Sequence, residues 1–186
     1  MLEFNFDLFP ELVTQRLVLR QMTPDDAANL FALNTNNDVL KYLDFLRMKT
    51  IDDAYKKIEK INKEIKNADC IYWAISTQEN PHELIGTICL FHFKKQHYRG
   101  EVGYLLHPDF WRKGILQECM YAVLNYGFDV LNLHSVEAIV DPENAASIGL
   151  LEKNKFVREA YFKEDFYQNG KFLDTAIYSL LKSNWK

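Results

Sequence analysis

The segment that most constrains the fold lies mid-chain, where a strand-like run passes through a short loop into a long amphipathic helix. Residues 101–106 read as a strand, His107 begins the loop, and a helical pattern runs over about residues 113–131. Apolar side chains recur there at spacings of three and four, which places them in two rows on the helix. The rows are Ile115, Cys119, Ala122 and Tyr126, and Leu116, Met120, Val123 and Val130. So broad an apolar surface predicts a helix packed deep against a sheet.

The other periodic segments extend this unit to a mixed α/β domain with one central sheet. We predict one domain over residues 1–186, with its core at about 12–182 and about four flanking helices. Asn169-Gly170 predicts a hairpin between the last two strands. The predicted strands are 16–20, 71–76, 84–93, 101–106, 135–140, 161–168 and 171–181. The predicted helices begin near Thr23 and Thr50 and cover about 113–131 and 144–154.

Composition excludes several classes of protein. The net charge is −4, from 22 basic and 26 acidic side chains, so the basic excess of a nucleic-acid binder is missing. No apolar run approaches the roughly 20 residues that span a bilayer, and residues 1–10 carry no basic segment of a signal peptide. We therefore expect a cytoplasmic protein that binds neither nucleic acid nor membrane.

The chain has three cysteines, at positions 70, 89 and 119, each inside an apolar run. This spacing predicts buried thiols rather than a disulfide scaffold. No cluster of His, Cys and acidic residues has the spacing of metal ligands, so we expect no metal.

The strand–loop–helix junction has the features of a phosphate site. The first amides of a helix lack partners inside the helix, Gly114 permits close approach, and Arg112 and Lys113 add positive charge. Many junctions share these features without binding anything. The loop also lacks the first Gly and the Ser or Thr of a Walker motif, which argues against a nucleotide kinase. No Gly-x-Gly-x-x-Gly follows a strand, so a dinucleotide enzyme is not indicated.

Four segments, in order, resemble the GNAT acetyltransferase superfamily and its Rim-type branch of ribosomal-protein N-terminal acetyltransferases. The resemblance spans roughly residues 12–181. The segments are Thr14-Gln15-Arg16-Leu17-Val18-Leu19-Arg20 with Thr23-Pro24-Asp25-Asp26, Glu101-Val102-Gly103-Tyr104, Trp111-Arg112-Lys113-Gly114-Ile115, and Asp141-Pro142-Glu143-Asn144-Ala145-Ala146-Ser147 with Glu152-Lys153-Asn154-Lys155-Phe156.

The resemblance implies a mixed, mostly antiparallel sheet that splays between its fourth and fifth strands, with the pantetheine arm of acetyl-CoA in the gap. Backbone groups of Leu105 and Leu106 would pair with pantetheine, and one of their amides would polarise the thioester carbonyl. The pyrophosphate would lie on the loop amides, and Asn144 would contact pantetheine or a water. The implied cofactor-binding residues are Leu105, Leu106, Arg112, Lys113, Gly114, Ile115, Leu116 and Asn144.

The chain departs from the family pattern at several positions. Arg112 stands where Gly is usual, Leu116 where Gly or Ala is usual, and Lys155 where the exit motif has Gly. None of these changes removes a backbone donor.

Two departures concern catalysis. Leu151 stands where many members have a Tyr that acts as the general acid. Phe166 aligns with a Glu assigned as base in Rim-type enzymes, so that base is absent unless Asp165 or Glu164 shifts into place. Ser147 is then the candidate proton donor, unless it only hydrogen-bonds its own helix. Glu101 is the first candidate base, unless it forms an ion pair with Arg99 or a neighbouring strand residue.

The implied reaction is acetyl transfer from acetyl-CoA to a primary amine. A protein N-terminal α-amine is favoured, because its pKa is near 8 whereas that of a lysine-type amine is near 10.4. A polyamine, an amino sugar or an amino acid stays open as acceptor, and so does acyl-CoA sensing without catalysis. The resemblance also implies a possible homodimer. Six aromatic residues are candidates for lining the acceptor cleft: Tyr42, Phe45, Tyr72, Phe91, Phe93 and Tyr167.

Overall fold

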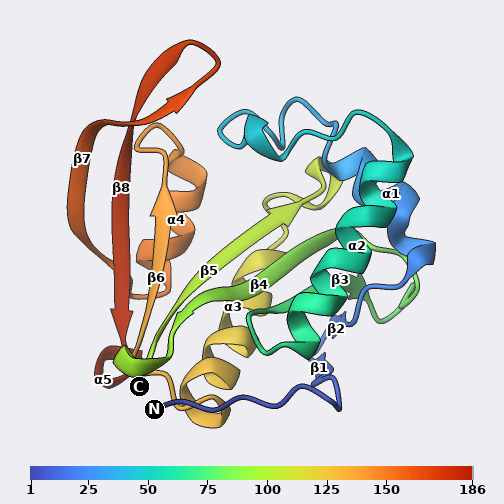
Figure 1. Ribbon diagram of the computed structural model, residues 1–186, viewed down its shortest axis with the longest axis horizontal. Helices are drawn as coiled ribbons and strands as arrows, with labels where there is room; N and C mark the ends of the chain where they lie inside the picture. Colours follow the sequence, from blue (N-terminus) through green and yellow to red (C-terminus); the bar gives the residue numbers. More distant parts are fainter. Residues whose placement is uncertain (186) are drawn as a thin grey trace.

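The computed structural model describes residues 1–185, apart from the side chain of residue 44. Eight strands form one sheet in the order β1-β2-β3-β4-β5-β6-β8-β7 (Figure 1), and only β5 and β6 pair in parallel. The strands are β1 (Leu12–Val13), β2 (Leu17–Arg20), β3 (Ile71–Thr77), β4 (Gly86–Lys94), β5 (Arg99–Leu106), β6 (Ser135–Val140), β7 (Val157–Gln168) and β8 (Lys171–Leu181). The helices are α1 (Ala27–Leu33), α2 (Ile51–Lys66), α3 (Ile115–Asn125), α4 (Ala145–Lys153) and the single turn α5 (Lys182–Trp185). The predicted fold class is confirmed.

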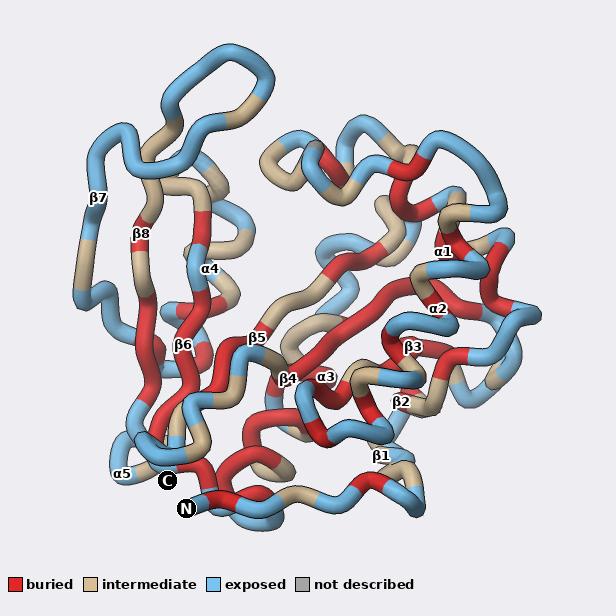
Figure 2. Tube along the Cα trace, in the orientation of Figure 1, coloured by how far each residue is buried: buried red, intermediate tan, exposed pale blue. Residues whose placement is uncertain are grey.

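The two faces of the sheet meet different helices. Trp73, Ile88 and Tyr104 are register neighbours on one face, and the Trp73 ring lies 5.6 Å from that of Tyr126, which follows α3. Side chains alternate along a strand, so Glu101 lies on the opposite face from Tyr104. Buried positions run along the central strands and the inner sides of the helices, whereas β7 is largely exposed (Figure 2).

The sheet opens where the parallel pair ends. The register joins β5 and β6 only at Arg99–Ser135, Gly100–Val136 and Glu101–Glu137, and beyond these residues the two strands diverge (Figure 1). The predicted splay therefore lies at the fifth and sixth strands by the present numbering. The difference of one arises because the short strand β1, which sequence reasoning missed, precedes β2.

The helix after the splay begins and ends differently from the prediction. Arg112 and Gly114 both have left-handed backbone, with φ of 60° and 75°, so α3 starts at Ile115 instead of about Lys113. Its last predicted turn is a π-helical turn, Tyr126–Val130. The predicted hairpin is present, and both turn residues have positive φ, 50° at Asn169 and 80° at Gly170.

Hydrogen bonds join the first turn of α3 to the C-terminal end of α4. Gln117 of α3 donates to Asn154 Oδ1 at 2.7 Å, and Asn154 Nδ2 donates back to Gln117 Oε1 at 3.2 Å. Asn154 is buried, so the reciprocal pair satisfies polar groups that water does not reach. The pair fixes the distance between α3 and α4, which follow β5 and β6 respectively.

All three cysteines are buried and unbridged, as predicted. Burial raises the pKa of each thiol, to about 12 at Cys70. Among the described residues, no helix has both the length and the apolar character to cross a membrane.

Candidate active site

The β5 backbone at the end of the splay faces two directions. The carbonyl of Leu105 points at β4, since a Cβ built on Gly86 would lie 2.5 Å from that oxygen. The His107 amide also donates to β4, at Ile85 O, 2.8 Å. Because alternate residues point to opposite strand edges, Leu106 presents its backbone to the β6 side. Its carbonyl accepts a 2.8 Å hydrogen bond from the Trp111 indole. The geometry favours Leu106 over Leu105 as a backbone partner for a chain in the gap.

The loop after β5 is held by the start of β2. Arg16 Nη1 donates to the Lys113 carbonyl at 2.9 Å, and Arg16 Nε donates to Glu118 Oε2 at 2.7 Å. Glu118 also accepts from Thr14 Oγ1 at 2.6 Å and from the Arg16 amide at 2.9 Å. Burial acts to raise the pKa of Glu118, but these donors hold it below its ordinary value. We call this set of hydrogen bonds, from Thr14 and Arg16 to Glu118 and Lys113, the clamp; sequence reasoning missed it. Its only signal was an acidic residue in the first turn of α3.

The clamped loop presents backbone to solvent. Residues 111–114 are exposed, and the first intrahelical bond of α3 runs from Glu118 N to Gly114 O. The amides of Ile115, Leu116 and Gln117 therefore precede the helical ladder, and Leu116 is half-buried. The positions of Arg112, Lys113 and Gly114 beside these amides fit an anionic group.

A hydrogen bond joins the two sides of the splay. Tyr104 of β5 and Ser147 of α4 place their hydroxyl oxygens 2.7 Å apart. Burial raises the pKa of Tyr104 to about 12, although the Ser147 contact acts to lower it. The Ser147 amide donates to Asn144 Oδ1 at 3.1 Å, so the Asn144 oxygen caps α4 and only its nitrogen is left for a ligand. Sequence reasoning named Ser147 but did not single out Tyr104.

At the point where the β5–β6 pairing ends, two carboxylates lie in register but in different surroundings. Glu137 accepts from Lys94 at 2.8 Å and from Arg99 at 2.9 Å. Burial acts to raise its pKa, but these cations hold the pKa below its ordinary value. Glu101 is 9% exposed, and its raised pKa follows from burial, partly offset by a 2.9 Å contact with His92 Nδ1. Of the alternative that Glu101 forms an ion pair, the Arg99 half is wrong, because Arg99 binds Glu137, whereas the neighbouring-strand half matches the contact with His92 on β4.

The segment between α1 and α2 meets the far side of the splay at two points. The Tyr42 hydroxyl donates to the Glu143 carbonyl at 3.1 Å, and the Phe45 and Phe166 rings meet edge-on at 5.8 Å. Phe166, on β7, thus makes an aromatic contact in place of the expected Glu. The other four aromatic candidates lie in different parts of the structure. Tyr72 and Phe91 lie on the Glu101 face, the Tyr167 ring lies tilted against that of Phe172, and Phe93 packs against Phe4.

Three further residues near the splay have local structural contacts. Leu151, where many family members have a Tyr, is fully buried and apolar and supplies no proton. His107 accepts from the Asp109 amide in the loop after β5, and the His134 amide donates to the Tyr98 carbonyl.

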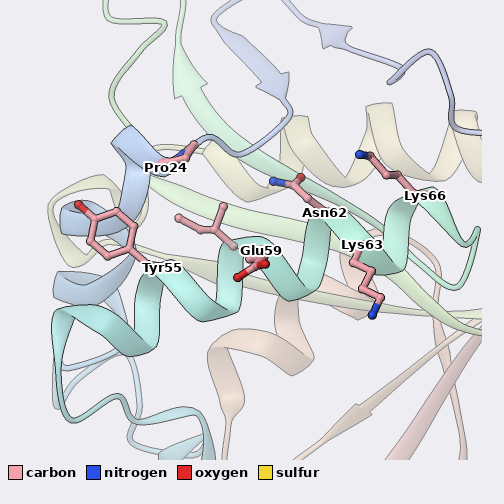
Figure 3. Close-up of a pocket in the computed structure, with 7 residues that line it drawn as sticks. Pro24, Tyr55, Glu59, Asn62, Lys63 and Lys66 are labelled. Atoms are coloured by element: carbon pink, nitrogen blue, oxygen red, sulfur yellow. The ribbon is translucent and has the colours of Figure 1, made fainter.

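A cavity of about 420 Å³ opens elsewhere, along the outer side of α2 (Figure 3). It is lined by Pro24, Tyr55, Ile58, Glu59, Asn62, Lys63 and Lys66. None of the predicted site residues belongs to it, so this cavity is separate from the splay.

Comparison with known proteins identifies the family. The model of the acetyltransferase (GNAT) domain matches residues 16–157. The uncharacterized N-acetyltransferase YoaA of Bacillus subtilis is 37% identical over 175 residues, which are 94% of this chain and 98% of the relative. The putative ribosomal N-acetyltransferase YdaF of the same organism is 26% identical, covering 96% of this chain and 98% of its own.

Structural similarity agrees with the sequence matches. Spermidine N-acetyltransferase from Vibrio cholerae, solved in complex with CoA and spermine, superposes with a TM-score of 0.81 at 26% identity. The match covers 92% of this chain and 99% of that one. The chain therefore belongs to the GNAT acetyltransferase family and is an N-acetyltransferase, with acetyl-CoA as its co-substrate.

Proposed function

We propose that the chain acetylates a protein N-terminal α-amine by direct attack on acetyl-CoA in a ternary complex. The carrying observation is the pair of proton-transfer groups along one gap, with Glu101 where the strands part and the Tyr104–Ser147 contact farther along. Two neighbouring acids in contrasting surroundings, Glu101 and Glu137, give the site one carboxylate suited to accept a proton.

Acetyl-CoA fits the residues that surround the splay. The pyrophosphate would lie on the amides of Lys113, Gly114, Ile115 and Leu116, at the exposed loop and the first turn of α3, with the Arg112 side chain adding charge. The pantetheine arm would follow the free edge of β5, where Leu106 offers backbone groups, and would pass the nitrogen of Asn144. Leu105 would contribute packing instead of hydrogen bonds.

The two proton-transfer groups lie on opposite faces of β5, which suits the chemistry. The amine nitrogen attacks the thioester carbon, so an N–C bond forms and the C–S bond breaks. Glu101 accepts one proton of the ammonium on one face, and the thiolate that leaves takes a proton from Ser147, which Tyr104 supports, on the other. The second proton that the nitrogen loses after attack restores the Ser147 hydroxyl. A β5 amide would stabilise the charge that develops on the thioester oxygen.

The protein acceptor is supported by the chemistry of the site. A carboxylate deprotonates an α-amine of pKa near 8 at lower cost than a polyamine nitrogen near 10.4. Two carboxylates of the β7–β8 hairpin that could attract a polycation, Asp165 and Asp174, make hydrogen bonds within the hairpin. Asp174 accepts from the Tyr161 hydroxyl and the Glu164 amide, and Asp165 accepts from Thr175.

A small-molecule amine is the second candidate, because a structural relative was solved with spermine. The decisive experiment measures release of free thiol from acetyl-CoA with a panel of N-terminal peptides, polyamines and amino sugars. Turnover with peptides alone supports the proposal, and turnover with polyamines alone supports the second candidate. Acetyl-CoA binding in calorimetry without turnover on any acceptor would favour a sensor and contradict both.

A homodimer stays a prediction. Sedimentation at several concentrations tests it, and a monomer throughout would contradict it.

A further inference from the structure

His92, in the last part of β4, contacts the candidate base but has no role in the reaction proposed above. Its Nδ1 lies 2.9 Å from Glu101 Oε2, yet 71% of the His92 side chain is exposed, against 12% for Glu101. The imidazole therefore connects a buried carboxylate to bulk water through one ring.

This contact depends on an irregularity in the sheet. The register between β4 and β5 shifts between Phe91 and Lys94, and His92 has a left-handed backbone with φ of 47°. Such a backbone is uncommon for a residue with a side chain, although His adopts it more readily than most residue types. The bulge places the ring beside Glu101, on a strand where regular pairing continues to Phe91–Glu101.

The other charged groups near Glu101 are already engaged. Lys94 of β4 and Arg99 of β5 both bind Glu137 of β6, and the buried thiol of Cys89 contacts the Gly103 carbonyl. Among the described residues around Glu101, His92 is thus the titratable group that makes direct contact with its carboxylate and also reaches solvent.

Proton balance shows why such a group is needed. Acetylation of a protonated amine gives an amide, a CoA thiol and one excess proton. Of the two protons that the ammonium nitrogen loses, one is balanced by the proton on the CoA thiol. The other must reach water during each turnover. A buried carboxylate that has accepted this proton must release it before it can act again.

Resting on the proposed acetyl transfer, we infer that His92 is a positioning and relay residue that carries the excess proton from Glu101 to solvent. The protonated Glu101 carboxyl gives its proton to Nδ1. Nε2 then gives a proton to water, so the ring ends neutral with its proton on Nδ1 and Glu101 ends ionised. Because the ring is largely exposed, proton exchange with water returns it to the Nε2–H tautomer before the next turnover.

The test uses His92→Asn, because Asn tolerates the left-handed backbone and cannot relay a proton. We expect kcat at pH 7 to fall about 10-fold, less than the roughly 10²–10⁴-fold contribution of a direct proton-transfer group. The acid limb of the rate profile should move to higher pH, since the His92 contact acts to lower the pKa of Glu101. The KM for acetyl-CoA should not change.

A second variant separates relay from structure. His92→Gly accepts the same backbone and leaves room for free imidazole, so added imidazole should restore much of the lost rate. The matched control is His97→Gly, in the exposed turn between β4 and β5, which imidazole should not stimulate. A 13C titration of the Glu101 carboxyl should give a higher midpoint in His92→Asn than in the wild type.

The outcomes distinguish the two proposals. Absence of turnover in the wild type on every acceptor would overturn the proposed function and this inference with it. Wild-type turnover with an unchanged rate, pH profile and Glu101 titration in His92→Asn would overturn the relay alone. Equal loss in Glu101→Gln and in the double variant with His92→Asn would support a shared route.

Discussion

Replacing Glu118 by Gln should loosen the loop that receives the pyrophosphate. Glu118 accepts from Thr14 Oγ1, from Arg16 Nε and from the Arg16 amide, and its side chain is 18% exposed whereas that of Arg16 is 48% exposed. A hydrogen bond to a charged group contributes about 1.5–3 kcal/mol, but an exposed partner reduces this through solvent screening. Because Gln keeps one acceptor oxygen, we expect a loss of about 1–2 kcal/mol in the free energy of unfolding.

Thermal denaturation followed by circular dichroism measures this loss. For a domain of this size, about 1–2 kcal/mol corresponds to a Tm lower by roughly 2–8 °C. The loss should depend on pH in a defined direction. The folded-state pKa of Glu118 lies below its ordinary value of 4.5, so the stabilisation is present above that value and disappears as pH falls through the folded-state pKa. Wild type and variant should therefore differ at pH 7 and converge in acid.

The control is Glu59→Gln, which removes a carboxylate from the exposed side of α2. This change should leave Tm within about 1 °C of the wild type, as expected for a surface substitution. In calorimetry, Glu118→Gln should also weaken CoA binding about 3–10-fold, since up to 1.4 kcal/mol corresponds to a tenfold change. If Glu118→Gln matched Glu59→Gln in both Tm and affinity, the clamp would have no energetic role.

Four further predictions concern the splay and the loop that follows β5. Glu101→Gln should lower kcat by at least about 10²-fold with CoA affinity unchanged. In the wild type, burial raises the pKa of Glu101, which must be ionised to act as a base, so kcat/KM should fall in acid at a pH above the ordinary Glu pKa of 4.5. A pH–rate profile of the wild type and of Glu101→Gln checks both expectations. Tyr104→Phe should lower kcat about 10-fold if its hydroxyl supports proton donation by Ser147, whereas unchanged kcat in stopped-flow assays would show that Tyr104 has no part in that donation. Gly114→Ala forces an alanine to φ 75° at a cost of about 1–2 kcal/mol and should weaken CoA binding, whereas Gly170→Ala, at φ 80° in the distant hairpin, should cost similar stability and leave affinity unchanged.

The fold could be predicted largely because its signals are local. The Asn169-Gly170 turn, the alternation in β3 and the apolar rows of α3 each follow from short-range periodicity. The missing strand β1 has two residues, too few to show a period. The late start of α3 follows from left-handed backbone at Arg112, which the residue type does not signal.

The site divides in the same way. Loop residues and Ser147 were found through ordered motifs, which sequence carries directly. The clamp from Arg16 to Glu118 joins residues 102 positions apart, and the Tyr104–Ser147 bond joins residues 43 apart. Neither pair has a spacing signal, because only the sheet brings the partners together. For Glu101 the sequence indicated a partner on a neighbouring strand but not which residue, since a bulge, and not regular alternation, places His92 beside it.

The early end of the β5–β6 ladder has a consequence for how the domain exchanges hydrogen with its surroundings. The β5 amides on the β6 side beyond Glu101 lie outside the ladder that shields their neighbours. In deuterated water these amides should exchange early, and bound acetyl-CoA should slow them by taking the position of an adjacent strand. The co-substrate would then be part of the cooperative unit of folding, and its dissociation after each turnover would return this part of the sheet to solvent.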